Sequence, residues 1–133
     1  MAFDDLIGIP FAYGGRSLAG LDCWGLVVEV YRRLGIAVED VAEYHDVLAT
    51  AANPVFETQR TAAWRQVGEP FEPHDVLLFS GGCCGAATHC AIWIGDGQVL
   101  HTREKTGVIV SPFRLLRSRF LGAYRRAEVP CPA

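Results

Sequence analysis

The amino-acid sequence predicts an α+β fold, with N-terminal helices packed on an antiparallel sheet of four to six strands. The chain has 133 residues, of which 50% are hydrophobic and 20% charged, so one domain covering residues 1–133 is expected. Apolar residues recur at helical spacing in the first half, most clearly in Cys23–Leu34. From Val76 onward they alternate with a period of two, which is typical of strands.

The N-terminal half is expected to contain a short helical turn and one well-defined helix. The turn lies within Phe3–Gly15 and leads into a glycine-rich loop. The helix over Cys23–Leu34 has an N-cap in Asp22 and a stop signal in Gly35. A further segment, Val41–Ala63, is expected to be helical in one or two pieces.

The C-terminal half is expected to form an antiparallel meander that follows a turn region in Gly68–Pro73. Short turns rich in glycine and aspartate separate the apolar runs, so consecutive strands should pair with each other. Strands are expected at Val76–Phe79, Cys90–Ile94, Gln98–Thr102 and Val108–Ser111, with a fifth at Leu121–Arg125.

One hairpin turn decides where two histidines point. Gly95–Gly97 predicts a three-residue loop with Gly97 in the left-handed conformation. Counting back from this loop pairs Ala91 with His101 and places His89 on the same sheet face, as the diagonal neighbour of His101. The two histidine Cβ atoms should then lie roughly 6–8 Å apart. A two-residue loop would instead place the histidines on opposite faces.

Cys23 is the first candidate for chemistry because it opens the expected helix. Free backbone N–H groups and the positive end of the helix dipole favour a thiolate at that position. The glycines at Gly14-Gly15 would let a substrate backbone approach closely. The alternative is a small cysteine buried under the sheet.

A thiolate nucleophile needs a base and an orienting group, so the four histidines matter. His45 and His74 lie in a charged stretch and in a proline-bounded turn, which favours surface positions. His89 and His101 lie on neighbouring expected strands, where they can act together with Cys23. A hydrogen-bonded pair with a purely structural role is the alternative.

The charge distribution is uneven along the chain. The net charge is −3, whereas the residues from Arg103 onward comprise seven basic and two acidic side chains, a balance of +5. The basic residues of this third form either a solvated face or a surface that faces an anionic substrate. Charge reversal at Arg103 and Arg114 would test the substrate-facing alternative. The net negative charge of the chain and the lack of a recognisable nucleic-acid-binding motif argue against a nucleic-acid partner.

Neither an export signal nor a membrane span is expected. Met1–Asp5 carries acidic residues where a secretory signal carries basic ones. Val76–Gly95 is long enough to span a bilayer and has no Asp, Glu, Lys or Arg. Its centre, Ser80–Gly85, reads as a loop, so a strand-loop-strand unit without membrane insertion is expected.

The chain has five cysteines, at positions 23, 83, 84, 90 and 131. Their odd number and their spacing do not indicate a disulfide framework. A metal or redox module built from Cys83, Cys84 and Cys90 is the alternative that their clustering leaves open. No metal is expected, because these spacings do not match common zinc sites.

Four blocks in a fixed order carry a family resemblance that spans nearly the whole chain. They are Gly8–Ser17, Gly20–Val27, Pro73–Phe79, and His89–Gly97 with Leu100-His101. Together they resemble the NlpC-type cell-wall cysteine peptidases. Asp-Cys-Trp-Gly at Asp22–Gly25 and the closing Phe120–Arg125 are most similar to the branch found in tail tips of long-tailed phages and gene-transfer particles.

The resemblance implies a minimal papain-like fold and a cysteine peptidase without metal or other cofactor. Cys23 corresponds to the nucleophile, His89 to the base and His101 to the orienting residue. Family members cleave amide bonds in peptidoglycan stem peptides, typically between D-glutamate and the diamino acid. Tyr13 and Asp22 are the candidates for substrate contact. The family tyrosine that lines the active site aligns with Phe11, so either one oxyanion donor is missing here or Tyr13 supplies it.

The resemblance also implies a setting for the protein. We expect a protein made in the bacterial cytoplasm, docked on tail hub or tail-tip proteins of the virion, and acting in the cell wall. The main alternative, prompted by Phe11, is a structural tail-tip component with little activity. An acyltransferase of the same fold is a further alternative, because water and amine acceptors use one thioester.

Overall fold

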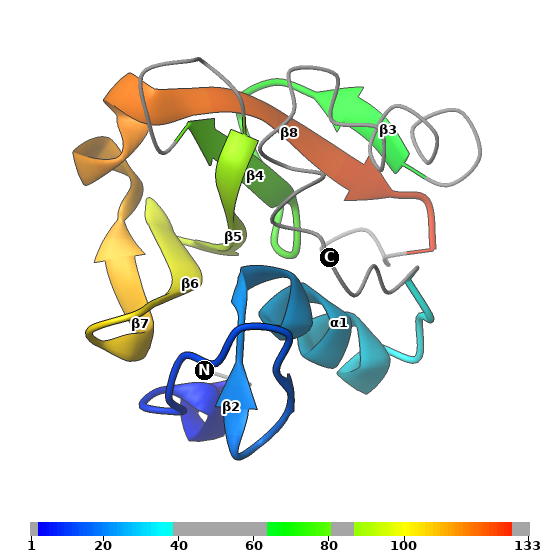
Figure 1. The fold of residues 1–133 in the computed structure, drawn as a ribbon. Coiled ribbons are helices and arrows are strands. Elements are labelled where there is room, and N and C mark those ends of the chain that lie inside the picture. The colour runs from blue at the N-terminus through cyan, green and yellow to red at the C-terminus, as the bar shows by residue number, and fades with distance from the viewer. Residues whose placement is uncertain (1–2, 39–63, 81–86, 129–133) are drawn as a thin grey trace.

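The computed structural model describes residues 3–38, 64–80 and 87–128, in which one α-helix packs against a six-stranded antiparallel sheet (Figure 1). This arrangement confirms the α+β prediction and the expected number of strands. The elements are 3₁₀ helix η1 (Asp4–Leu6), β1 (Arg16–Ser17), β2 (Gly20–Leu21), α1 (Cys23–Arg33), β3 (Trp64–Val67), β4 (Val76–Ser80), β5 (Ala87–Gly95), β6 (Gln98–Arg103), β7 (Gly107–Pro112), the 3₁₀ helices η2 (Phe113–Leu115) and η3 (Arg117–Arg119), and β8 (Phe120–Arg126).

The large sheet has the strand order β3-β8-β4-β5-β6-β7. Strands β4 to β7 form the expected meander, and β8 returns to pair with the outer edge of β4. The sequence analysis missed β3, which pairs with β8, and the two-residue strands β1 and β2, which form a separate small sheet. These strands are too short to show a clear alternation of apolar and polar residues.

Helix α1 begins at Cys23 as expected and ends one residue earlier than predicted. The Asp22 carboxylate caps it by accepting a hydrogen bond of 2.7 Å from the Gly25 N–H. Gly35 follows the helix with φ of 79°, a left-handed conformation that favours glycine. The helix buries one face against the sheet, as the apolar spacing predicts: Leu26, Val27, Val30 and Tyr31 are each at most 1% exposed.

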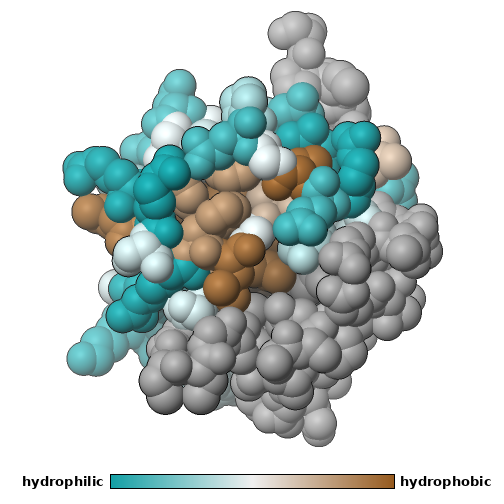
Figure 2. All heavy atoms as spheres, turned by 90° about the horizontal axis from the view of Figure 1, so that it is seen from above, coloured by the Kyte–Doolittle hydropathy of each residue, from teal (hydrophilic) through white to brown (hydrophobic). Residues whose placement is uncertain are grey.

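The sheet separates two apolar clusters because side chains alternate along each strand. The first cluster joins α1 to one face of the sheet through residues such as Val76, Leu78, Cys90, Ile92 and Leu100. The second cluster covers the other face and includes Leu77, Phe79, Ala91, Val99 and Phe113. Viewed from above, the surface has apolar residues at its centre with hydrophilic residues around them (Figure 2).

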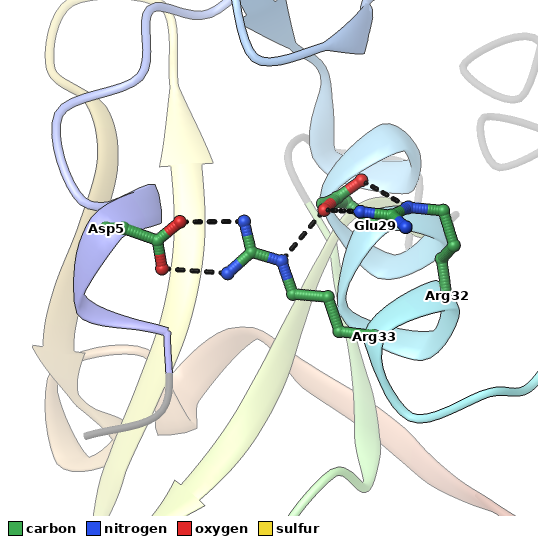
Figure 3. A network of polar contacts seen from close by, with 4 residues as sticks. All are labelled: Asp5, Glu29, Arg32 and Arg33. Atoms are coloured by element: carbon green, nitrogen blue, oxygen red, sulfur yellow. Dashed lines mark hydrogen bonds and ion pairs between the residues drawn. The ribbon is translucent and has the colours of Figure 1, made fainter.

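An ion-pair network fastens the N-terminal segment to α1. Arg33 donates two hydrogen bonds of 2.7 Å to the Asp5 carboxylate of η1 and one of 2.8 Å to Glu29 (Figure 3). Arg32 also contacts Glu29, so one carboxylate joins two arginines of the last helical turn. These contacts lower the pKa of Asp5 and of Glu29. The 3₁₀ helix η1 is thereby held at the end of α1 opposite to Cys23.

Within the described ranges, no helix is long and apolar enough to cross a membrane. The uncharged stretch Val76–Gly95 instead supplies strands β4 and β5, as predicted. Several predictions lie outside the described residues. These are the helical segment Val41–Ala63, His45, the Cys83-Cys84 loop and Cys131.

Candidate active site

The β5–β6 hairpin differs from the expected one in its turn. Asp96 and Gly97 have φ of 55° and 74°, which makes a two-residue turn with both central residues left-handed, and Gly95 pairs with Gln98. The predicted three-residue loop is therefore wrong. A register shift between Trp93 and Gly95 supplies the missing residue, since Ile94 is bulged out of the ladder.

The bulge restores the pairing that the prediction needs farther along the hairpin. Ile92 pairs with Leu100, which is the register in which Ala91 faces His101. His89 and His101 consequently lie on the same face of the sheet, as expected. The two-residue turn alone would have separated them, so the bulge is the feature that brings them together.

The imidazoles of His89 and His101 are in direct contact. His89 Nε2 lies 2.9 Å from His101 Nδ1, and the ring planes meet at 71° with centroids 5.1 Å apart. His89 is half-buried and its ring lies 6.1 Å from that of Phe79, its cross-strand partner on β4. The Nε2 atom of His89 is thus engaged by His101, which leaves Nδ1 as the nitrogen for another partner.

His101 is buried and electrically neutral across the physiological range. It is 1% exposed, and burial, followed by the charges of His89 and Arg103, lowers the pKa of His101 to about 3. Its second nitrogen, Nε2, lies 2.8 Å from the Ser111 hydroxyl oxygen on β7. Ser111 was not predicted as a site residue, although it falls on an expected strand and pairs with Val99, two residues before His101.

Cys23 lies at the first turn of α1 and is 2% exposed. Its side chain is hydrogen-bonded to the thiol of Cys90 on β5, and this contact together with burial raises the pKa of Cys90. Cys90 directly follows His89 on β5, and its side chain belongs to the cluster on the α1 face of the sheet, whereas His89 shares the face of its cross-strand partner Phe79. The sequence analysis did not single out Cys90 as a neighbour of Cys23, because no local pattern reports a contact between a helix and a distant strand.

The contacts of the predicted catalytic residues fall into two groups. His89 and His101 contact each other, and Cys23 contacts the residue next to His89. The direct pairing of Cys23 with His89 stays a prediction. An imidazole whose one nitrogen is held by a neutral partner suits the role of a base, because the other nitrogen can exchange a proton with a thiol.

Asp22 fixes the backbone around Cys23. It is fully buried, and its carboxylate accepts hydrogen bonds from the Gly25 and Gly14 N–H groups and forms a 2.7 Å ion pair with Arg16. The Arg16 charge offsets that of Asp22 beside the thiol. Gly25 is required here because a Cβ would overlap the carbonyl oxygen of Gly15. Substrate contact by Asp22 stays a prediction, whereas its capping role is seen directly.

Tyr13 is an exposed residue of the loop that precedes Cys23. Its side chain is 66% exposed, its ring packs edge-on against Phe11 at 4.9 Å, and its hydroxyl donates a hydrogen bond to Glu104. That hydrogen bond raises the pKa of Tyr13, so the phenol keeps its proton. Glu104 lies in the β6–β7 turn, and the contact therefore joins the Cys23 loop to the hairpin that carries His101.

Two basic residues of the C-terminal third, Arg103 and Arg114, lie at different ends of one hairpin. Arg103 ends β6 beside the β6–β7 turn, where it pairs with Gly107. Arg114 lies beyond Pro112 at the other end of the same hairpin, where it lines an open pocket of about 320 Å³. The charge of Arg103 lowers the pKa of His101, which places Arg103 on the side of the histidine pair.

His74 differs from the expectation of a solvated surface residue. It is half-buried with φ of 78°, and its ring packs edge-on against Phe3 at 5.8 Å. Burial lowers the pKa of His74, and its carbonyl oxygen accepts a hydrogen bond from the Tyr31 hydroxyl. These contacts give His74 a structural role at the α1 side of the sheet.

Residues 8–125 match the model of the NlpC/P60 family. A gamma-DL-glutamyl hydrolase of Bacillus subtilis is 28% identical over 97% of this chain and 29% of its own length. A protein described as a probable endopeptidase of Mycobacterium tuberculosis is 32% identical over 72% of this chain and 20% of its own length. The chain thus spans less than a third of the length of these relatives.

Solved structures share the fold. The NlpC/P60 domain of the peptidoglycan hydrolase SagA superposes with a TM-score of 0.62 at 23% identity, covering 90% of this chain and 89% of that one. An NlpC/P60 family protein from Bacillus cereus superposes with a TM-score of 0.68 at 22% identity, covering 91% of this chain and 36% of that one. The papain-like α+β fold expected from the sequence is confirmed.

Proposed function

The chain belongs to the NlpC/P60 family, and from this premise we propose that it is a cysteine peptidase that cleaves an amide bond in peptidoglycan stem peptides. The observation that carries the proposal is the hydrogen-bonded pair of His89 and His101 beside the point where Cys23 meets β5. The base and the orienting group are assigned to this pair, and the nucleophile to Cys23 of α1, whose contact on β5 is the residue next to His89.

The proposed reaction begins with proton transfer from the Cys23 thiol to Nδ1 of His89. The thiolate attacks the amide carbonyl, a C–S bond forms, and the tetrahedral oxyanion collapses with cleavage of the C–N bond. The imidazolium of His89 gives its proton to the departing amine. The uncharged ring of His101 accepts from His89 Nε2–H and holds the ring in place throughout.

The second half of the reaction regenerates the enzyme. Water attacks the thioester while His89 takes up its proton, the carboxylate product leaves, and the thiol of Cys23 is restored. The backbone N–H of Cys23 is the proposed oxyanion donor, since it lies at the start of α1, where the positive end of the helix dipole favours a developing negative charge. Tyr13 is the proposed side-chain contact to the substrate, because its exposed ring stands in the loop before Cys23.

The bond proposed for cleavage joins D-glutamate to the diamino acid of the stem peptide. Two observations support it: the sequence resemblance of the four blocks, and the similarity to a relative described as a gamma-DL-glutamyl hydrolase. The stem peptide carries carboxylates, and Arg103 is a basic side chain close enough to lower the pKa of His101. We assign Arg103 to the attraction of this anionic substrate.

The setting proposed for the reaction is the tail tip of a phage or gene-transfer particle, with a tail hub protein as the partner. It rests on the resemblance of Asp22–Gly25 and Phe120–Arg125 to that branch of the family. Mass spectrometry of purified particles tests it. Stoichiometric presence of the chain in particles supports the proposal, and its absence from them contradicts it.

A structural tail-tip component with little activity is the second candidate. Two observations favour it: Cys23 is only 2% exposed, and Phe11 replaces the tyrosine expected from the family resemblance. The two candidates differ in what they require of the thiol. A structural role tolerates Cys23→Ala, whereas a peptidase loses its nucleophile.

Mass spectrometry of muropeptides after incubation with the protein tests the proposed activity. We expect the wild type to release stem-peptide fragments and Cys23→Ala to release none. Cys90→Ala is the matched control, since it removes the neighbouring buried thiol and leaves the nucleophile. Equal cleavage by wild type and Cys23→Ala would refute the cysteine mechanism, and no cleavage by a folded wild type would favour the structural candidate.

A further inference from the structure

Three side chains from adjacent strands form a continuous hydrogen-bonded line. His89 on β5 contacts His101 on β6 at 2.9 Å, and the far nitrogen of His101 contacts the Ser111 hydroxyl on β7 at 2.8 Å. Because Val99 pairs with Ser111, Ser111 lies on the same sheet face as the two rings. The line ends at Ser111, which is half-buried.

The neutral ring of His101 carries a single proton, on either Nδ1 or Nε2. With the proton on Nδ1, His101 donates to His89 Nε2, which forces the proton of a neutral His89 onto Nδ1. His89 Nδ1 then has no lone pair for a thiol proton. With the proton on Nε2, His101 Nδ1 accepts from His89, and His89 Nδ1 is ready to act as a base.

The charged state of His89 permits only one of these arrangements. Imidazolium carries protons on both nitrogens, so His89 Nε2 must donate and His101 Nδ1 must accept. The proton of His101 then lies on Nε2, which points at the Ser111 oxygen. His101 is 1% exposed, so without an acceptor at that position this N–H would be buried with no partner among the described residues.

From this geometry we propose that Ser111 is a positioning residue of the peptidase. It accepts the His101 Nε2 proton, selects the tautomer in which His101 supports His89, and stabilises the charged His89 that forms when Cys23 is deprotonated. The kinetic effect of Ser111 rests on the proposed function, because it presupposes that the chain is a peptidase. The tautomer itself is a property of the folded chain and exists whether or not the chain cleaves peptidoglycan.

Nitrogen-15 NMR of the histidine rings tests the tautomer directly. We expect His101 of the wild type to carry its proton on Nε2 at neutral pH, and Ser111→Ala to move a measurable share of it to Nδ1. Ser111→Thr keeps a hydroxyl and should retain the wild-type tautomer. A wild-type His101 protonated on Nδ1, or a tautomer unaffected by Ser111→Ala, overturns the proposal. This readout holds even if the wild type proves inactive on muropeptides.

Kinetics of muropeptide cleavage give the second readout. Ser111→Ala should lower kcat by about 10-fold or more, as loss of a group that orients a functional histidine commonly does, with KM within about two-fold. Ser111→Thr should recover most of the loss. Thr106→Ala is the matched control, because it removes a hydroxyl of the β6–β7 turn that donates its hydrogen bond to the Gly107 carbonyl, away from the His89–His101–Ser111 line. Equal loss in the Ala and Thr variants of Ser111 would show a packing effect and overturn the proposal.

Discussion

His89 and His101 face each other across β5 and β6, with the nearest ring nitrogens 2.9 Å apart. The contact depends on one bulged residue, Ile94, which shifts the register behind a two-residue turn. It also depends on burial, which keeps His101 uncharged and able to support a charged His89. A local backbone irregularity and a desolvated ring together define the site.

Stability should fall on mild acidification because of His101. Its pKa is about 3 in the folded protein against 6.5 ordinarily, so only the unfolded chain takes up this proton between those values. The part of the free energy of unfolding that depends on a neutral His101 is therefore fully present above pH 6.5. It declines as the pH falls, by up to about 1.4 kcal/mol per pH unit. Urea unfolding at pH 6.5 and 5 measures it, in a range above the titration of ordinary carboxylates.

The variant His101→Gln isolates this contribution. It should lose less stability than the wild type between pH 6.5 and 5, because the titrating ring is gone. Some loss should remain, since burial also lowers the pKa of His74. Identical losses in wild type and His101→Gln would contradict a neutral, buried His101.

Asp22→Ala should destabilise the fold strongly. The change removes the helix cap, the acceptor for Gly14 N–H and the partner of Arg16, and we expect a cost of about 2–4 kcal/mol in the free energy of unfolding. Asp22→Asn keeps an oxygen for the Gly25 N–H and should cost less. Urea denaturation of both variants checks the order, and equal costs would show that the cap adds nothing.

Charge reversal at Arg103 should weaken substrate binding. Arg103→Glu places a negative charge near the histidine pair, where we expect KM for anionic stem peptides to rise roughly three- to ten-fold at low salt. Arg114→Glu is the control, because Arg114 lies at the other end of the β6–β7 hairpin. Equal effects of the two reversals on KM would point to overall charge and contradict a local role.

The sequence was sufficient to predict much of the architecture. The spacing of Leu26, Val27, Val30 and Tyr31 and the cap at Asp22 predict α1 to within one residue at each end. The alternation after Val76 predicts five of the six strands of the large sheet. Both signals are local, since helical and strand periods are read within a few residues.

The remaining features depend on contacts that a local pattern does not encode. The bulge at Ile94 compensates for a turn that was predicted wrongly, so the histidine register was correct although the loop was not. The neighbour relations of Cys23 with Cys90 and of His101 with Ser111 arise from packing between different elements. Arg103 and Arg114 are close in sequence but lie at opposite ends of one hairpin.

The central claim is that His89 activates the thiol of Cys23. The rate of Cys23 alkylation by iodoacetamide, followed by peptide mass spectrometry as a function of pH, tests this pairing directly. We predict that the reaction of wild-type Cys23 reaches half its maximal rate well below about pH 8.5, where an ordinary thiol is half ionised, and that His89→Ala shifts the profile to that of an ordinary thiol. Superimposable profiles for the wild type and His89→Ala would contradict the account.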